Sequence, residues 1–365
     1  MKMRRKVTAL LLMFSVMLFT LTGCGNGTEE TKQAAENVKE ETGGQTEKGT
    51  QEEAESADEE TGGQTAGSEP AQLRVGSLKG PTSIGLLKLM KESEEKTTAD
   101  NYTFTMETAA DALLPMLLQE QLDIALVPAN VASVLYNKTE GGVTVIDVNT
   151  LGVLYMVSAD TSPGSIADLK GKTIYLTGKG TTPDYVLHYI LAQNGIGEEE
   201  VTLEYKSEAA EVASVLASQP ESIGLLPQPF VTAACIQNES LQVIFDMTKE
   251  WRALQGESGS ELVTGVTVVR NGFLEENKAA VDRFLEAHKA STDFANTQVE
   301  ETAKLAAEKG IIEKEQIAAK AIPECHITYM DGEDMKAALS GYLEVLMEQN
   351  PESIGGKLPG ADFYY

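Results

Sequence analysis

The sequence predicts an α/β protein built from two lobes. Its central unit, at 73–90, combines a short strand pattern, a Gly80-Pro81 break and an amphipathic helix pattern. A second unit of the same kind follows at 173–191, and two apolar segments at 151–159 and 261–270 flank it. We therefore expect two α/β lobes joined by two crossing segments, with a ligand cleft between the lobes.

The strand of the first unit, at 73–78, leads through a polar loop into a helix. We expect Thr82 or Ser83 to cap this helix, because a hydroxyl oxygen accepts hydrogen bonds from the free backbone N–H groups of the first turn. Those N–H groups, beside the Ser77 hydroxyl, form a cradle that suits a small polar or anionic ligand. The alternative is a capped helix that binds nothing.

The loop of the second unit repeats that of the first, since KGTTP at 179–183 corresponds to KGPTS at 79–83. Downstream, SIGLLPQP at 222–229 corresponds to DIALVPAN at 123–130. Loops that follow strands gather at one edge of a sheet, so the repeat predicts one binding loop from each lobe. The expected ligand contacts are Ser77, Lys79, Gly80, Pro81, Thr82 and Ser83 in the first loop, and Thr177, Lys179, Gly180, Thr181 and Thr182 in the second.

Four further residues are candidates for ligand contact. Asn130 and Gln228 stand at helix starts, where an amide can face the cleft, although capping alone would explain Asn130. Trp251 is the only tryptophan; it either stacks on a planar ligand or packs a loop, and we favour packing. Tyr155 lies on the first crossing segment, where a single tyrosine is usually part of the core.

Strands and helices alternate along the body, which is typical of a mostly parallel sheet. In the first lobe we expect strands at 102–107, 122–127 and 142–148, with helices at 109–120 and 129–136, the former shortened or kinked by Pro115. In the second lobe we expect strands at 173–177, 201–206, 222–226 and 241–246, with helices at 184–194, 208–217 and 229–237. Helices at 273–296, 299–309, 313–321 and 332–349 should pack on the first lobe. Lobe 1 is then 71–155 with 265–365, and lobe 2 is 156–264.

The N-terminus has the pattern of a secretory signal, with basic residues at 2–6 and an apolar run at 7–21. The sequence LTGC that follows resembles a bacterial lipobox, which predicts a signal peptide at 1–23 and lipidation of Cys24; the alternative is a plain signal peptide with an incidental cysteine. Residues 25–70 carry thirteen acidic and three basic side chains and few large apolar ones, so 24–70 is predicted to be a disordered acidic tether. We expect the protein to be anchored by lipid to the cell membrane, on its extracytoplasmic face.

Charge and motifs exclude several classes of function. A formal net charge of −27 argues against nucleic acid as a partner and against direct adsorption to anionic lipid. The chain has no Walker, G-x-S-x-G or H-E-x-x-H motif, so we expect no catalytic residues and no cofactor. The adjacent Cys325 and His326 lack metal-site spacing, and His188 and His288 are expected to be exposed on helices. Cys235 and Cys325 can pair in an exported protein, but two buried free thiols are favoured.

Five segments carry a resemblance that covers nearly all of 73–365: GSLKGPTS at 76–83, DIALVPAN at 123–130, LPQPF at 226–230, LVTGVTVVR at 262–270 and GGKLPGADFYY at 355–365. They resemble the substrate-binding lipoproteins of ABC importers, in the group named for nitrate, sulfonate, taurine and thiamine-pyrimidine uptake. The resemblance implies a type II periplasmic-binding-protein fold in a monomer. It also implies that the lobes close on a small-molecule solute and then deliver it to an ABC permease with its ATPase.

The resemblance leaves the ligand and two other functions open. Neither loop contains arginine, so a bidentate clamp for a sulfonate or carboxylate is not evident. The expected ligand is a small polar organic solute or a pyrimidine-like molecule. One alternative is an enzyme on the same fold, of the pyrimidine synthase or dehydratase type, although the cysteine-rich stretch of those synthases is missing here. The other is a lipoprotein that senses or recognises a partner.

Overall fold

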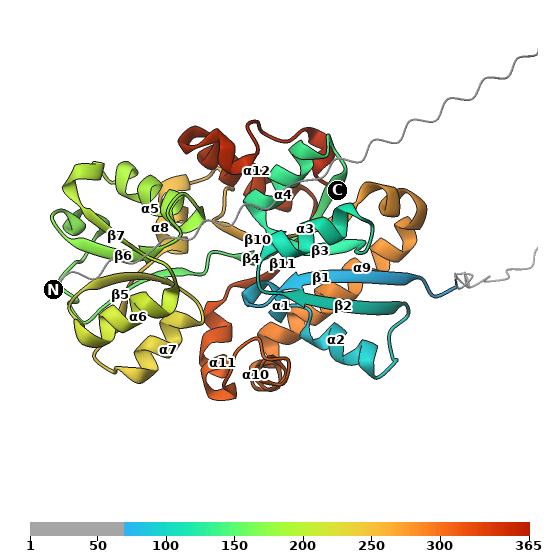
Figure 1. Ribbon diagram of the computed structural model, residues 1–365, viewed down its shortest axis with the longest axis horizontal. Helices are drawn as coiled ribbons and strands as arrows, with labels where there is room; N and C mark the ends of the chain where they lie inside the picture. Colours follow the sequence, from blue (N-terminus) through green and yellow to red (C-terminus); the bar gives the residue numbers. More distant parts are fainter. Residues whose placement is uncertain (1–68) are drawn as a thin grey trace, which may run out of the picture. The chain divides into compact units, whose positions relative to one another are not determined.

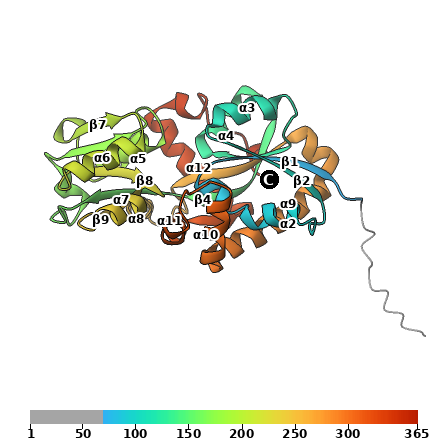
Figure 2. The ribbon, with the colours of Figure 1, turned by 60° about the horizontal axis from the view of Figure 1, so that its bottom comes forward.

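The computed structural model describes residues 69–365 (Figure 1). The predicted signal peptide at 1–23, the predicted lipidation site Cys24 and nearly all of the predicted tether at 24–70 lie outside the described residues. Within 69–365, no helix combines the length and the apolar character that crossing a membrane requires. The described residues form two β-sheets, each covered by helices on both faces (Figures 1 and 2).

The first sheet has six strands in the order β11-β4-β10-β3-β1-β2. Strand β1 pairs in parallel with β2 and β3, whereas β10 runs antiparallel to β3 and β4, and β11 runs antiparallel to β4. The strands are β1 (Gln72–Leu78), β2 (Asn101–Glu107), β3 (Ile124–Pro128), β4 (Val143–Leu151), β10 (Val263–Arg270) and β11 (Ile327–Met330).

Alternating side chains of the central strands fill a core on each face of the first sheet. On β3, Ile124 and Leu126 join the core under α2, α9, α10 and α11, while Ala125 and Val127 join the core under α3, α4 and α12 (Figure 2). The helices are α1 (Pro81–Ile84), α2 (Leu87–Glu94), α3 (Ala110–Leu118), α4 (Ala129–Lys138), α9 (Asn271–Thr297), α10 (Val299–Glu308), α11 (Glu315–Ala321) and α12 (Gly332–Gln349). The second half of the chain thus completes the layers that the first half begins.

The second sheet has five strands in the order β7-β6-β8-β5-β9. Strand β6 pairs in parallel with β7 and β8, and β5 runs antiparallel to β8 and β9. Its strands are β5 (Leu154–Ser158), β6 (Thr173–Thr177), β7 (Thr202–Lys206), β8 (Ile223–Pro227) and β9 (Gln242–Asp246), and its helices are α5 (Thr182–Gln193), α6 (Ala209–Ser218), α7 (Phe230–Gln237) and α8 (Met247–Gln255). Met156 of β5 joins the core that contains α5 and α8, whereas Tyr155 and Val157 join the core that contains α6 and α7.

Both sheets are mixed rather than mostly parallel, because β5 and β10 run antiparallel to their neighbours. The expected crossing at 151–159 is divided: β4 ends at Leu151 in the first sheet and β5 begins at Leu154 in the second. The predicted lobe limit at 155/156 therefore falls inside β5, all of which pairs in the second sheet. The two sheets are also connected through helices, since α11 contacts α7 and α12 contacts α5.

Other sequence expectations differ from the structure in detail. The expected cap at Thr82 or Ser83 is wrong, because Gly80 precedes the first turn of α1 and both hydroxyl residues lie within that helix. Pro115 lies inside the nine-residue helix α3. Helix α8 and strand β11 were not expected; the remaining helices and strands lie within a few residues of their predicted positions.

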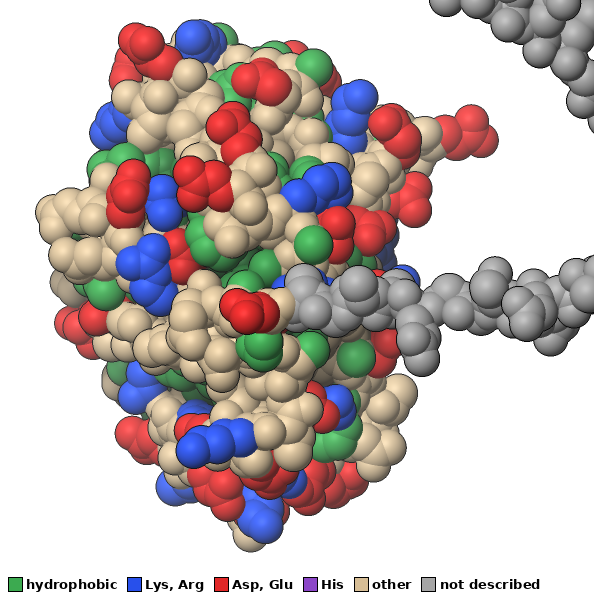
Figure 3. Space-filling model, turned by 90° about the vertical axis from the view of Figure 1, so that its right-hand side faces the viewer, with side chains coloured by type: hydrophobic (Ala, Val, Ile, Leu, Met, Phe, Trp, Pro, Cys, Tyr) green, Lys and Arg blue, Asp and Glu red, His purple; other side chains and the backbone are tan. Residues whose placement is uncertain are grey.

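The surface carries acidic and basic side chains together. On the face shown in Figure 3, red acidic and blue basic side chains are interspersed with polar and apolar ones. On this face, therefore, the basic side chains do not form the continuous positive patch that a polyanion requires.

Candidate functional site

The hydroxyl groups of the first loop are used within the loop. Ser83 Oγ lies 2.6 Å from the carbonyl oxygen of Leu78 and 2.7 Å from Ser77 Oγ. Since a hydroxyl has one proton, Ser83 donates to the carbonyl and accepts from Ser77. Thr82 Oγ1 donates to the same carbonyl at 3.3 Å. Ser77, Thr82 and Ser83 are buried, while Gly80 and Pro81 are partly exposed.

The same loop is held to the rest of the first sheet by its backbone. The Lys79 backbone N–H donates to Glu107 at 2.8 Å, and the Lys79 side chain is exposed. Thr82 lies against Gly265 of β10 so closely that a Cβ added at Gly265 would be 2.6 Å from Thr82 Cγ2. The loop is therefore a packed structural element, and its contact with a ligand stays a prediction.

The second loop also forms its hydrogen bonds internally. The Gly180 N–H donates to the Asp184 carboxylate at 2.7 Å, and Thr181 Oγ1 donates to Gly178 at 2.5 Å. The Lys179 ammonium lies 5.2 Å from the centre of the Tyr205 ring, in a cation–π arrangement. Thr177 and Thr182 are partly buried, and Lys179, Gly180 and Thr181 are exposed. A ligand role for these five residues likewise stays a prediction.

Asn130 and Trp251 have structural contacts. Asn130 Nδ2 donates to the Ser353 carbonyl at 3.3 Å, which connects α4 to the C-terminal segment. Trp251 is fully buried between Tyr189 and Tyr342, with ring centres 4.9 and 5.6 Å away, and its indole N–H donates to Ser260 at 3.3 Å. Packing, the interpretation that the sequence favoured for Trp251, accounts for its position.

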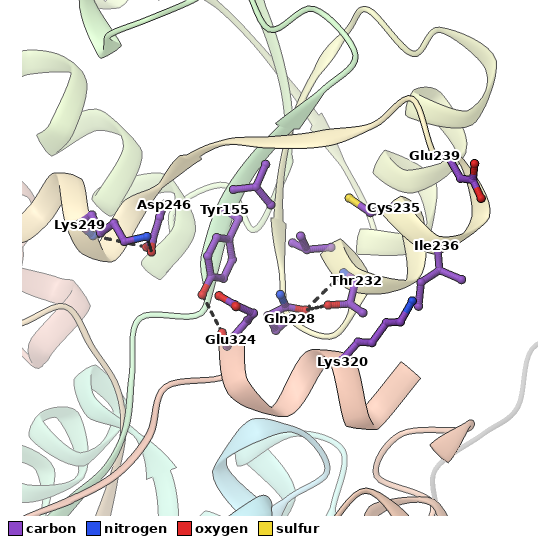
Figure 4. Close-up of a pocket in the computed structure, with 12 residues that line it drawn as sticks. Tyr155, Gln228, Thr232, Cys235, Ile236, Glu239, Asp246, Lys249, Lys320 and Glu324 are labelled. Carbon is purple, nitrogen blue, oxygen red and sulfur yellow. Dashed lines mark hydrogen bonds and ion pairs between the residues drawn. The ribbon is translucent and has the colours of Figure 1, made fainter. Parts of the chain in front are cut away.

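Tyr155 and Gln228, by contrast, line one cavity of about 630 Å³, which we call the Tyr155 cavity (Figure 4). Its second-sheet side comes from β5, α7, β9 and α8, and its opposite side from α11 and the turn after it. A cavity of this volume is within the range of small-molecule sites. The lining residues are Tyr155, Gln228, Val231, Thr232, Cys235, Ile236, Glu239, Val243, Asp246, Lys249, Lys320 and Glu324.

Gln228 presents its amide nitrogen to the cavity. Its Oε1 accepts from the Thr232 N–H at 3.3 Å and from the Thr232 hydroxyl at 2.8 Å, and the residue is almost fully buried. These two donors fix the carbonyl oxygen toward α7, so the NH₂ group faces the other way. Within 69–365 the amide nitrogen has no hydrogen-bond partner, which leaves two donors for a ligand.

Tyr155 connects the two sides of the cavity. Its hydroxyl donates to the Glu324 carbonyl at 2.7 Å, so β5 of the second sheet is bonded to the segment that follows α11. Burial raises the pKa of the Tyr155 hydroxyl well above its usual value, and the negative charges of Asp246 and Glu324 add to the shift. The phenol therefore remains a protonated donor throughout the neutral range.

The charged groups of the cavity are of two kinds. Asp246 and Lys249 form an ion pair at 3.2 Å, and the Asp246 carboxylate also caps α8 by accepting from the Thr248 N–H at 2.9 Å. Lys320 and Glu324 also line the cavity, but neither has an ion-pair partner within the described part of the chain. The site thus offers an ammonium, a carboxylate, an amide and an aromatic ring to a solute.

Cys235 contributes a thiol, a potential nucleophile, to the lining of the Tyr155 cavity. Burial raises the pKa of its thiol, which favours the protonated and less reactive form. Cys235 and Cys325 are both free, as the sequence favoured, and Cys325 is fully buried while Cys235 is partly buried. Over residues 69–365, no group of three or more His, Cys, Asp and Glu side chains could hold a metal ion.

The expectation that His288 is exposed is wrong. His288 is fully buried, and its Nδ1 lies 3.2 Å from the Asp147 carboxylate of β4. The other oxygen of Asp147 accepts from the Thr267 hydroxyl at 2.8 Å. A buried carboxylate on the facing strand therefore explains a polar residue on the inner face of α9. His188 is partly exposed and lies 3.2 Å from Asp184.

Sequence reasoning missed Thr232, Lys320 and Glu324. Thr232 lies one turn after Gln228, so its contact with the Gln228 amide could have been inferred from helix periodicity. Lys320 and Glu324 belong to the C-terminal helices, and no local signal indicates that α11 meets α7 of the second sheet. Their place in the cavity follows from tertiary packing alone.

Comparisons with known proteins find one matching family model and solved structures of the same fold. The model of the NMT1/THI5-like family matches residues 141–302. No curated protein sequence matches the chain. A solved structure described as an ABC transporter from Parabacteroides distasonis is similar with a TM-score of 0.67 and 24% identity, over 80% of this chain and 98% of that chain.

Two further solved structures show which activities occur on this fold. The periplasmic aliphatic sulphonate binding protein SsuA from Escherichia coli is similar with a TM-score of 0.63 and 17% identity, over 80% of this chain and 92% of that chain. The desulfurization enzyme DSZB is similar with a TM-score of 0.55 and 13% identity, over 77% of this chain and 92% of that chain. Residues 141–302 therefore resemble the NMT1/THI5-like family, and the described residues have the two-lobed α/β fold of the solved periplasmic binding proteins.

Proposed function

We propose that the protein is the extracytoplasmic solute-binding lipoprotein of an ABC importer, with the Tyr155 cavity as its solute site. The observation that carries the proposal is the composition of this cavity, whose two sides come from the second sheet and from helices that cover the first. A solute that contacts both sides favours the arrangement in which they are close together. The permease can then distinguish the loaded form from the empty one.

The other parts of the proposal follow from the sequence pattern. Cys24 carries the lipid, and residues 24–70 are the tether. The monomeric receptor delivers a small polar solute to the permease and its ATPase. Relatives on this fold that bind aliphatic sulphonates support a transport role.

The experiment is a thermal-shift screen of the purified full-length chain against small polar solutes. A solute that binds only the native state raises the melting temperature by mass action. In Gln228→Met, which keeps the length of the side chain and removes the amide donors, the shift should be lost. Gln237→Met on the exposed end of α7 is the matched control and should keep it. A shift that survives in Gln228→Met would place the solute elsewhere, and no shift with any solute would refute the proposed function.

An enzyme on the same fold is the second candidate, because the desulfurization enzyme shares the architecture. The raised thiol pKa of Cys235 argues against a cysteine nucleophile in the cavity. Mass spectrometry of the solute after prolonged incubation with the protein separates the two functions. Recovery of the unchanged solute supports a receptor, and accumulation of a product supports an enzyme.

A further inference from the structure

Two opposite charges on one wall of the Tyr155 cavity lack ion-pair partners. Lys320 near the end of α11 and Glu324 in the following turn are four positions apart, a spacing at which lysine and glutamate commonly pair on a helix. Within residues 69–365 they form no ion pair with each other or with another side chain, although Asp246 and Lys249 across the cavity are paired at 3.2 Å. Both side chains are exposed, so the wall presents one positive and one negative group to the cavity and to solvent, each without an ion-pair partner among residues 69–365.

The two groups point to different parts of the cavity. In Figure 4, the Lys320 ammonium reaches toward Ile236, whereas Glu324 lies beside Tyr155. Gln228 lies between them, with its oxygen held by Thr232. The Lys320 ammonium thus lies at one end of this wall and the Glu324 carboxylate at the other, with Gln228 between them in the view of Figure 4.

The remaining carboxylates do not neutralise Lys320. Asp246 is engaged by Lys249 and by the N-terminus of α8. Glu239 lies beyond Ile236 at the rim in Figure 4, and it is exposed. A ligand acid group at Lys320 therefore meets no internal competitor of the same sign at that end of the cavity.

We infer that the solute of the Tyr155 cavity is a small zwitterion, whose acid group binds Lys320 and whose ammonium binds Glu324 beside the Tyr155 ring. This inference rests on the proposed function and narrows its solute class. A simple anion would satisfy Lys320 but would leave the Glu324 carboxylate unpaired near its own negative charge. A simple cation would leave Lys320 and the Gln228 amide without acceptors. A zwitterion pairs with both Lys320 and Glu324, and the two side chains keep their separate positions at the ends of the wall.

The test compares molecules that differ only in one charge, by isothermal titration of the full-length chain. The zwitterions are β-alanine, 4-aminobutyrate and taurine; the matched anions are propionate, butyrate and ethanesulfonate; the matched cation is propylamine. We expect at least one zwitterion to bind and its single-charge analogues to bind about 10- to 100-fold more weakly, which is the size of one charge-assisted hydrogen bond.

Paired variants test which side chains make the distinction. Lys320→Met and Glu324→Gln should each weaken binding of the zwitterion about 10- to 100-fold. Glu324→Gln should also improve the relative binding of the matched anion, because the repelling charge is gone. Lys314→Met and Glu313→Gln remove the same charges from exposed positions before α11 that do not line the cavity, and they should change nothing.

The outcomes separate this inference from the proposed function. Equal binding of the zwitterion and its matched anion, or binding that is unchanged in both cavity variants, would overturn the zwitterion class. The zwitterion class would also be overturned if no zwitterion binds while another solute from the screen binds in a way that depends on Gln228. That result would leave the receptor function standing. Failure of all solutes in the screen would refute both.

Discussion

Replacing Gly152 with alanine tests how tightly the connection between the two sheets is packed. Gly152 lies in the two-residue segment between β4 and β5, and it is buried. A Cβ at this position would be 2.3 Å from Thr248 Oγ1 and 2.6 Å from Leu262 Cδ2. Its backbone does not have the left-handed conformation that requires glycine, so the effect of alanine is one of space alone.

The magnitude follows from the two contacts that must change. Overpacking a buried site typically costs about 1 to 3 kcal/mol. Thr248 Oγ1 donates to the Gly152 carbonyl at 3.1 Å, and displacing it loses a hydrogen bond worth about 1 kcal/mol. We therefore expect Gly152→Ala to lower the free energy of unfolding by about 2 to 4 kcal/mol.

Urea unfolding followed by fluorescence of Trp251 measures this change. Trp251 is the only tryptophan, it is fully buried, and it lies on α8, the helix that contains Thr248. Gly164→Ala is the matched control, because Gly164 is exposed and a Cβ there would meet only Asp168 Oδ2, at 3.9 Å. The control should change stability by less than about 0.5 kcal/mol.

A second variant identifies the clashing atom. In Thr248→Ala the nearest atom, Thr248 Oγ1, is absent. Adding Gly152→Ala to that variant should therefore lower the free energy of unfolding by at least about 0.5 kcal/mol less than it does in the wild-type background. If Gly152→Ala alone stays within about 0.5 kcal/mol of the wild type, Thr248 and Leu262 yield without cost and the reasoning is refuted.

Two further predictions concern titratable groups. Asp100 is buried, which opposes its ionisation, but hydrogen bonds from Arg283 and the Ala71 N–H outweigh burial and hold its pKa below the usual value. Asp100→Asn should therefore lower the free energy of unfolding by about 1 to 3 kcal/mol at pH 7. This difference from the wild type should fade as the pH drops from about 4, the usual pKa of aspartate, through the lower pKa that Asp100 has in the native state. Urea titrations at several pH values check this, and a difference that does not depend on pH would contradict it. Burial raises the pKa of the Cys325 thiol to about 12, whereas Cys235 is partly exposed and has a smaller upward shift. Iodoacetamide at pH 8, followed by peptide mass mapping, should label Cys235 slowly and Cys325 only in urea; native labelling of Cys325 would show that its core opens.

Much of the fold could be predicted because local sequence records which face of an element is buried. The strand at 173–177 was predicted with its observed bounds, since Ile174 and Leu176 alternate with partly exposed neighbours. Helix α8 was missed although Asp246 gives an N-cap signal and Met247, Trp251 and Leu254 follow at helical spacing. Strand β11 was missed because four residues carry too little pattern, and among residues 69–365 it pairs only with β4.

The candidate site could be predicted only in part. Gln228 and Tyr155 were found because a helix start after a strand and an aromatic residue on a crossing segment are local features. The two repeated loops were equally prominent in the sequence, yet the hydroxyl groups of Ser77 and Ser83 bond within the first loop, and the Gly180 N–H binds Asp184 in the second. Hydrogen-bond partners depend on which groups the backbone brings within about 3 Å, and residue type alone does not fix them.

The sequence by itself determined that the chain forms α/β units, which strands are buried, and that the body is large and acidic with a repeated strand–loop–helix unit. The tertiary structure alone decided that both sheets are mixed, that His288 lies buried against Asp147, and that Lys320 and Glu324 face Gln228. The physical reason is the range of the interactions. Periodicity and capping act over one or two turns of chain. The cavity, by contrast, is made where α7 (Phe230–Gln237) meets α11 (Glu315–Ala321), and these helices are far apart in the sequence. They meet because helices from distant parts of the chain cover the apolar faces of the two sheets.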